Sequence, residues 1–286
     1  MEIYQLRIRH KFKIKGGNNM VKLTIDGIQV EAEKGTSVLH AAESVGIKIP
    51  TLCYIKDLLP DGSCRMCMVE IESRGRTKME TACTAQVSEG LVVTTNSEKV
   101  RNARRNILDM LLSNHKTDCF SCPSNGDCKL QELCFEYGIE RTTYSGEQTE
   151  LPIDDSNKFF TYNPNLCILC HRCVNTCHKV VGRGAIDTME RGFDSAIGTP
   201  FHIDWADTNC ESCGNCVQAC PTGALTMKRR KNYRKYQIDK KVLTTCPHCA
   251  TGCQYYLLVK DNRIVDVEGA NGASNKGLLC VKGRSA

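Results

Sequence analysis

Residues 167–177 read CILCHRCVNTC, and residues 210–220 read CESCGNCVQAC. In each run, two residues separate the first three cysteines from one another, and three residues separate the third from the fourth. This spacing is typical of proteins that bind two 4Fe–4S clusters, in which three cysteines of one run share a cluster with the fourth cysteine of the other. It predicts one cluster on Cys167, Cys170, Cys173 and Cys220, and a second on Cys177, Cys210, Cys213 and Cys216. Two zinc sites are the alternative, although four thiolates around zinc do not require this spacing twice.

The composition favours metal binding over disulfides. The chain has 286 residues, which predicts two to four domains, and 20 of the residues are cysteines. Disulfide-rich secreted proteins are shorter and follow a signal peptide. Here the cysteines form closely spaced pairs, which indicates ligands in a reducing compartment, so we expect a cytoplasmic protein. No apolar run approaches the roughly twenty residues that cross a bilayer, so no membrane span is expected.

The net charge of +6 comes largely from residues 1–19, where five Lys or Arg face one Glu. Clusters bound by thiolates add about −2 each when oxidised, which argues against a nucleic-acid partner. We interpret residues 1–19 as a translated leader or disordered arm, with Met20 as the natural start. A basic targeting arm is the alternative.

Residues 20–97 show the pattern of a β-grasp ferredoxin. Val21, Leu23 and Ile25 alternate before an Asp26-Gly27 turn, and Ile28 and Val30 resume the alternation. A short helix capped by Thr36 or Ser37 should follow and end at Gly46. The spacing of the next four cysteines suits a 2Fe–2S cluster, with expected ligands Cys53, Cys64, Cys67 and Cys83.

The segment GSCRMCMVE at residues 62–70 resembles a known family. Its members are the large iron–sulfur subunit of respiratory NADH dehydrogenase, iron-only hydrogenases and NAD-linked formate dehydrogenases. In residues 98–150, a helix starting at Ser97 should expose Arg101, Arg104 and Arg105. After it, the spacing His-x3-Cys-x2-Cys-x5-Cys is similar to the His-plus-three-Cys domain of the same family. This resemblance implies a 4Fe–4S cluster on His115, Cys119, Cys122 and Cys128. Cys134 is expected to be a buried free thiol.

Residues 151–230 contain the two-cluster runs. His178 replaces the usual proline after Cys177, and neither His171 nor His178 is expected to be a ligand. The basic stretch at 228–241 is either a solvated linker or a docking strip for an acidic partner.

Residues 231–286 contain four further cysteines, which are Cys246, Cys249, Cys253 and Cys280. Two strands, 257–259 and 264–267, should flank an Asp261-Asn262 turn. This part is similar to the N-terminal 4Fe–4S domain of molybdopterin oxidoreductases, formate dehydrogenases in particular, and VKGR at 281–284 matches the motif of that family. The resemblance implies a fourth 4Fe–4S cluster, with Lys282 between the cluster and a pterin.

Together these patterns predict an α+β multidomain protein with one 2Fe–2S and four 4Fe–4S clusters. Its domains would be a β-grasp ferredoxin, a helical His/Cys domain, a two-cluster ferredoxin domain and a β-rich 4Fe–4S cap. The resemblance implies electron transfer between an NAD(P)H-diaphorase or ferredoxin-type partner and a molybdopterin or tungstopterin subunit that oxidises formate. We expect no complete catalytic site in this sequence. The alternatives are a subunit of a hydrogenase or NADH dehydrogenase, part of a longer formate dehydrogenase, or a zinc-binding interaction module.

Overall fold

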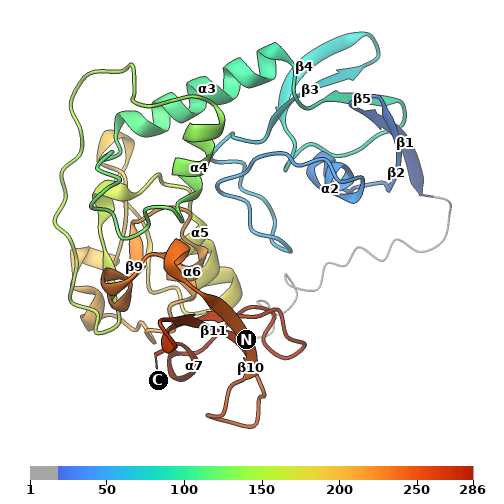
Figure 1. Cartoon of the computed structure of the whole chain (residues 1–286). Coiled ribbons are helices and arrows are strands. Elements are labelled where there is room, and N and C mark those ends of the chain that lie inside the picture. The colour runs from blue at the N-terminus through green and yellow to red at the C-terminus, as the bar shows by residue number, and fades with distance from the viewer. Residues whose placement is uncertain (1–18, 286) are drawn as a thin grey trace.

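The computed structural model describes residues 19–285, and four sheets follow one another along this part of the chain (Figure 1). The predicted leader lies outside the described residues, apart from Asn19. Within the described part, no helix is both long and apolar enough to cross a membrane.

The first sheet has five strands in the order β2-β1-β5-β3-β4, with β1 parallel to β5 and all other pairs antiparallel. Together with one helix, its elements are β1 (Met20–Ile25), β2 (Ile28–Glu33), α2 (Val38–Ser44), β3 (Met68–Ser73), β4 (Arg76–Thr81) and β5 (Leu91–Thr94). The predicted hairpin and helix are confirmed. Asp26 and Gly27 both have positive φ, as a two-residue hairpin turn of the right twist requires. The Ser37 hydroxyl accepts a hydrogen bond from His40 N and caps α2.

The core of this unit lies between the sheet and α2. Leu23, Ile25 and Val93 from the sheet and Leu39 from the helix are at most 1% exposed. Ile28 does not join them and is 47% exposed, because it lies beside the turn at the end of the outermost strand.

The second part is helical, with α3 (Glu98–Ser113) capped by Ser97 and α4 (Lys129–Glu136) packed beside it. One prediction here is wrong, because Arg104 is buried while Arg101 and Arg105 are exposed. Arg104 lies four residues from the buried Val100 and Leu108, so it shares their face of the helix.

The two cysteine runs fold into a unit of short elements. The strands β6 (Phe160–Tyr162) and β9 (Leu225–Met227) pair, as do β7 (Asp187–Met189) and β8 (Ala196–Gly198). Its helices are α5 (Arg172–Asn175), which continues as a π-helix over Thr176–Val181, and α6 (Asn215–Ala219). Short 3-10 turns cover Pro164–Leu166, Gly192–Asp194, Pro200–His202, Trp205–Asp207, Lys228–Asn232 and Lys235–Gln237.

The last part is a three-stranded antiparallel sheet of β10 (Lys240–Thr245), β11 (Gln254–Lys260) and β12 (Arg263–Gly269), followed by α7 (Val281–Ser285). The predicted hairpin around Asp261 and Asn262 is confirmed, and both residues have positive φ. Strand β10 was missed because its first residues belong to the basic stretch.

Candidate metal centres

Four buried cysteines meet at the N-terminal site (Cys53, Cys64, Cys67 and Cys83), and none is more than 8% exposed. The Sγ atoms of Cys67 and Cys83 are 3.4 Å apart. A hydrogen bond from Cys64 lowers the pKa of Cys53 to about 5, and the same bond raises the pKa of Cys64. A hydrogen bond with Cys83 likewise lowers the pKa of Cys67. Four converging sulfurs are a donor set suited to a thiolate-bound cluster.

The two runs line two cavities with a crossed distribution of cysteines. One cavity, with about 310 Å³ of unfilled space, is lined by the cysteines of the first-run site, which are Cys167, Cys170, Cys173 and Cys220. The other, with about 380 Å³, is lined by those of the second-run site, which are Cys177, Cys210, Cys213 and Cys216. The structure therefore brings together the two sets of four that the spacing predicts.

Backbone geometry repeats at the two runs. Leu169 and His171 in the first run, and Ser212 and Gly214 in the second, all have φ between 50° and 69°. For leucine and serine this conformation is strained and is typically retained at functional sites. In both runs, the first residue with this conformation donates a backbone hydrogen bond to the cysteine two residues earlier. Leu169 N lies 3.4 Å from Cys167 Sγ, and Ser212 N lies 3.4 Å from Cys210 Sγ. Backbone donors aimed at sulfur are one means by which a protein tunes an iron–sulfur cluster.

The chemistry of the buried thiols also fits a cationic core. Burial raises the pKa of Cys167 and of Cys170 to about 12, and it raises the pKa of Cys216 as well. Thiolates in such surroundings need a nearby positive charge, which iron supplies. In the second-run cavity, Trp205 is 2% exposed, and its Nε1 has no acceptor at hydrogen-bond distance among the described residues. Trp205 nevertheless lies close enough to Cys210 to lower the pKa of that thiol, against the larger effect of burial.

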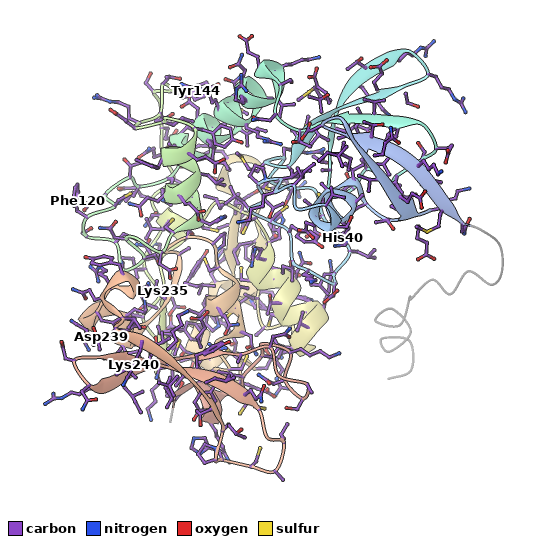
Figure 2. All side chains as sticks on the ribbon, turned by 45° about the vertical axis from the view of Figure 1, so that its right-hand side comes forward. His40, Phe120, Tyr144, Lys235, Asp239 and Lys240 are labelled. Carbon is purple, nitrogen blue, oxygen red and sulfur yellow. The ribbon has the colours of Figure 1, made fainter. Side chains whose placement is uncertain are left out.

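The His115 site is defined by the four ligands that the sequence predicts, which are His115, Cys119, Cys122 and Cys128. His115 is 7% exposed, and its Nδ1 has no hydrogen-bond partner among the described residues. Burial lowers the pKa of His115 to about 4, so the imidazole is neutral and able to ligate a metal. Burial raises the pKa of Cys119 and of Cys128, and the nearby charge of Cys122 adds a smaller effect to both. Phe120 projects into solvent at 92% exposure, so this end of the site lies near the surface (Figure 2).

Cys134 is buried, as predicted, at 8% exposure. Burial raises its pKa to about 11, with a smaller contribution from Cys128. It therefore lies near the His115 site as a protonated thiol.

The terminal site (Cys246, Cys249, Cys253 and Cys280) is the most open of the five. Cys249 and Cys280 are exposed, whereas Cys246 is 8% exposed. The charges of the other three cysteines raise the pKa of Cys253, after the larger effect of burial. A hydrogen bond with Thr251 lowers the pKa of Cys249, and the nearby charge of Lys282 adds to this effect.

The first-run site adjoins the N-terminal site. Arg172 lies between two cysteines of the first run, and it donates to Tyr54 O at 2.9 Å and to Ala219 O at 2.6 Å. Asn175 donates to Asp61, which also pairs with Lys179 at 3.4 Å. One apolar cluster contains residues of both sites and of the helices between them: Leu52, Cys53, Cys64, Met66, Leu108, Leu112, Leu130, Leu133, Cys134, Ile168 and Cys170.

The His115 site also adjoins the first-run site, through the residues that follow Cys220. Lys129 N donates to Pro221 O at 2.8 Å. A Cβ on Gly223 would lie 2.5 Å from Cys122 Sγ, so only glycine allows this approach. The His115 site therefore packs directly behind Cys220.

The second-run site adjoins the terminal site through α6. Asn215 exchanges hydrogen bonds with the backbone of Leu279 at 3.0 and 3.1 Å, next to Cys280. Gln218 donates to Gly277 O at 2.9 Å. The two-run unit thus contacts each of the other three units.

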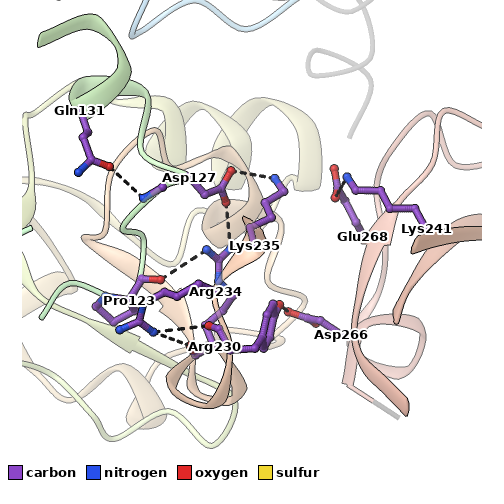
Figure 3. A network of polar contacts seen from close by, with 11 residues as sticks. Pro123, Asp127, Gln131, Arg230, Arg234, Lys235, Lys241, Asp266 and Glu268 are labelled. Carbon is purple, nitrogen blue, oxygen red and sulfur yellow. Dashed lines mark hydrogen bonds and ion pairs between the residues drawn. The ribbon is translucent and has the colours of Figure 1, made fainter. Parts of the chain in front are cut away.

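The basic stretch is not a solvated linker. Asp127, one residue before the ligand candidate Cys128, pairs with Arg230 at 3.0 Å and with Lys235 at 2.9 Å (Figure 3). Arg229 pairs with the buried Asp266 on β12. These charges bind the C-terminal sheet to the rest of the protein, and they are not available as a set to an acidic partner.

Among residues 19–285, no three His, Cys, Asp or Glu side chains are placed to hold a single metal ion. Sequence reasoning missed three residues that join the sites, namely Asp61, Arg172 and Asn215. None of them stands in a recognisable spacing, so only the fold could identify them.

Five family models match the chain, and the last three of the matched ranges overlap in turn. They are the 2Fe-2S iron-sulfur cluster binding domain (residues 18–98), the NADH-ubiquinone oxidoreductase-G iron-sulfur binding region (104–143), the ferredoxin-like domain of NADH-quinone oxidoreductase subunit 3 (159–226), the 4Fe-4S dicluster domain (209–257) and the molybdopterin oxidoreductase Fe4S4 domain (239–286).

Curated relatives match over most of the chain. The NADPH-Fe(3+) oxidoreductase subunit alpha of Geobacter sulfurreducens is 40% identical over 93% of this chain and 31% of its own length. The G 2 subunit of the NADH-quinone oxidoreductase of Rhizobium meliloti gives the same three values. The NADP-reducing hydrogenase subunit HndD of Solidesulfovibrio fructosivorans is 39% identical over 72% of this chain and 36% of its own length. The chain thus spans about a third of the length of these relatives.

A solved structure agrees with these relatives. A chain from the crystal structure of an NAD+-reducing [NiFe]-hydrogenase in the H2-reduced state matches with a TM-score of 0.67 and 31% identity, over 73% of this chain and 87% of that chain. The protein therefore belongs to the NADH-quinone oxidoreductase-G and NAD-reducing hydrogenase-like family of iron–sulfur proteins, of which it carries the 2Fe–2S and ferredoxin-like 4Fe–4S domains.

Proposed function

We propose that the protein transfers single electrons within an NADH- or NADPH-linked oxidoreductase or hydrogenase complex. The observation that carries this proposal is the direct contact between cysteine sites. The N-terminal and His115 sites both adjoin the first-run site, and the terminal site adjoins the second-run site. Five separate sites that adjoin one another in this way suit a relay of electrons better than a single reaction centre.

The proposed ligands are the five sets of four residues defined above. They would hold one 2Fe–2S cluster at the N-terminal site and a 4Fe–4S cluster at each of the others. When bound, such clusters supply one-electron oxidation and reduction. The chain supplies the thiolates and the imidazole, and at four of the sites its fold buries or half-buries the cysteines. It also directs backbone donors to the sulfurs of Cys167 and Cys210.

The relatives favour an NAD(P)H-linked partner over the formate-oxidising partner expected from residues 246–284. The Geobacter and Rhizobium proteins cover 93% of the chain, so their similarity extends into residues 239–286. Sequence similar to part of residues 239–286 therefore also occurs in proteins whose names refer to NADPH or NADH. A molybdopterin or tungstopterin partner remains the second candidate, favoured by the match of residues 239–286 to the molybdopterin oxidoreductase Fe4S4 domain and by the exposed position of Cys249, Cys280 and Lys282.

The test is to reconstitute the full chain anaerobically with iron and sulfide and to titrate it with dithionite. The proposal predicts about 18 irons per chain, two at the N-terminal site and sixteen at the others, with equal sulfide. It also predicts uptake of about five electrons, one per cluster. A zinc-binding module would contain zinc without sulfide and would take up no electrons, and that result would overturn the proposal.

Two cysteine variants test the assignment of ligands. Cys177→Ser should abolish the electron paramagnetic resonance signal of the centre bound by Cys210, Cys213 and Cys216, and leave the signal of the first-run site. Cys134→Ser is the matched control, because it removes a buried thiol that is not a proposed ligand, and it should retain all 18 irons. The partner class is tested by adding an NADH-oxidising diaphorase or a formate-oxidising enzyme and comparing the rates at which the reconstituted chain is reduced.

A further inference from the structure

Arg284 is a buried cation at the junction between the terminal and second-run units. It is 4% exposed, and it lies in α7, four residues after Cys280. Its Nε donates to Cys213 O at 2.8 Å, and one terminal nitrogen donates to Asn215 Oδ1 at 3.0 Å and to Gln218 Oε1 at 2.9 Å. All three acceptors belong to the loop and helix that carry Cys213 and Cys216.

These hydrogen-bond acceptors are neutral oxygens. In the described part of the chain, no carboxylate forms an ion pair with Arg284, and the buried Asp266 pairs with Arg229 instead. Burial lowers the pKa of Arg284, against the smaller effects of the charges of Cys213, Asp266 and Cys216, and a guanidinium remains charged at neutral pH. Two arginines, the half-buried Arg229 and the buried Arg284, lie near the single carboxylate of Asp266, so a further anion is expected close to Arg284.

The residues around Arg284 indicate where that anion lies. Gly214 follows Cys213, and a Cβ on Gly214 would lie 2.4 Å from Arg284 Cδ, so the arginine stem packs directly on this loop. Gly214 also lines the second-run cavity, together with Cys213 and Cys216. Four thiolates around a 4Fe–4S core leave a net negative charge there, which would compensate the guanidinium.

We propose that Arg284 raises the reduction potential of the centre at the second-run site, and so makes it the preferred electron acceptor next to the terminal site. This inference rests on the proposed function, because it requires a 4Fe–4S cluster on Cys177, Cys210, Cys213 and Cys216. One-electron reduction by a low-potential donor adds one negative charge at the site and breaks no bond. Arg284 stabilises that added charge, and Arg284 itself is not oxidised or reduced.

A second arginine provides a comparison within the same unit. Arg183 also lines the second-run cavity, but Glu211 pairs with it at 2.9 Å and its side chain is 45% exposed. Both side chains of this pair are about half exposed, so water screens the charge of each of them, and it still screens Glu211 when Arg183 is removed. Arg183 should therefore influence the potential much less than Arg284, although both residues carry the same charge.

The experiment is a redox titration of the reconstituted full chain, followed by electron paramagnetic resonance, with the Cys177→Ser variant identifying the signal of the second-run site. Arg284→Gln keeps some hydrogen bonding and removes the charge, and it should reduce the equilibrium constant for reduction at least tenfold, which is about 59 mV for one electron. Arg284→Lys keeps the charge but loses the forked geometry, and it should restore most of the potential. Arg183→Gln should shift the constant less than twofold.

The possible outcomes separate the two proposals. If iron is absent from the second-run site of the unsubstituted protein, the proposed function fails. If the centre is present and Arg284→Gln leaves its potential unchanged, the role of Arg284 is refuted while the proposed function stands. If Arg284→Lys and Arg284→Gln lower the potential equally, the effect comes from lost structure and not from charge, which also refutes the inference.

Discussion

Replacing Arg104 by methionine should destabilise the contact between the first sheet and the helices that follow it. The buried guanidinium donates to Met68 O at 2.7 Å and to Tyr137 OH at 3.0 Å, and so connects β3 to the end of α4. A hydrogen bond to a charged group contributes roughly 1.5–3 kcal/mol, and removing the guanidinium leaves Met68 O without this donor. Release of a buried charge offsets part of the loss, so we expect a net loss of about 2–4 kcal/mol.

The assay is thermal unfolding of the reconstituted protein, followed by circular dichroism. For a protein of this size, 1 kcal/mol shifts the midpoint by about 2–4 °C, so Arg104→Met should lower it by roughly 10 °C. The matched control is Arg105→Met, which changes an exposed neighbour on the same helix and should shift the midpoint by no more than about 2 °C. Equal midpoints for the two variants would refute the structural role of Arg104.

Three further predictions concern the sites themselves. Gly223→Ala places a Cβ 2.5 Å from Cys122 Sγ and should lower the iron content by about four atoms per chain. The control is Gly283→Ala, whose Cβ would be 3.5 Å from Cys246 Sγ and which should retain all the iron. Equal iron contents for the two variants would contradict the packing. His115→Cys should keep four irons and lower the potential of that centre by on the order of 100 mV, because a thiolate adds negative charge; an unchanged potential in a redox titration would exclude His115 as a ligand. Removal of iron and sulfide should make residues 159–228 sensitive to trypsin before residues 20–97. The reason is that candidate ligand cysteines make up a larger part of the apolar core around the two runs than of the core of the first sheet. Simultaneous cleavage of both parts, followed on a gel, would contradict this order.

Local patterns in the sequence predicted the local structure well. The alternation before Asp26 gave the first hairpin, Ser37 and Ser97 gave two helix starts, and Asp261-Asn262 gave the last hairpin. In each case the deciding physics acts within a few residues, through side-chain periodicity, a capping hydroxyl or positive φ. The spacing of the two runs also predicted which cysteines line each of the two cavities.

The contacts between units could not be predicted in this way. Arg104 was assigned to solvent because charged residues are mostly exposed, but its buried partners come from β3 and α4, remote in sequence. The sequence leaves the role of the basic stretch open, because the partner of Arg230 and Lys235 is Asp127, which lies more than a hundred positions earlier in the chain. Such pairings depend on how the units pack, and no periodicity or spacing encodes that.

The crossed arrangement of the two runs has a consequence for synthesis of the protein. The first cavity needs Cys220 to complete its set of four, and the second needs Cys177 in addition to the later run. During translation, all four sulfurs of the N-terminal site exist once residue 83 has been made, and those of the His115 site once residue 128 has been made. Neither central set is complete before residue 216 has been made, and the first requires four residues more. Iron delivered earlier would encounter three thiols in the first run with a fourth, Cys177, on the wrong side, so correct assembly at the centre of the molecule favours metal insertion after the nascent chain has folded.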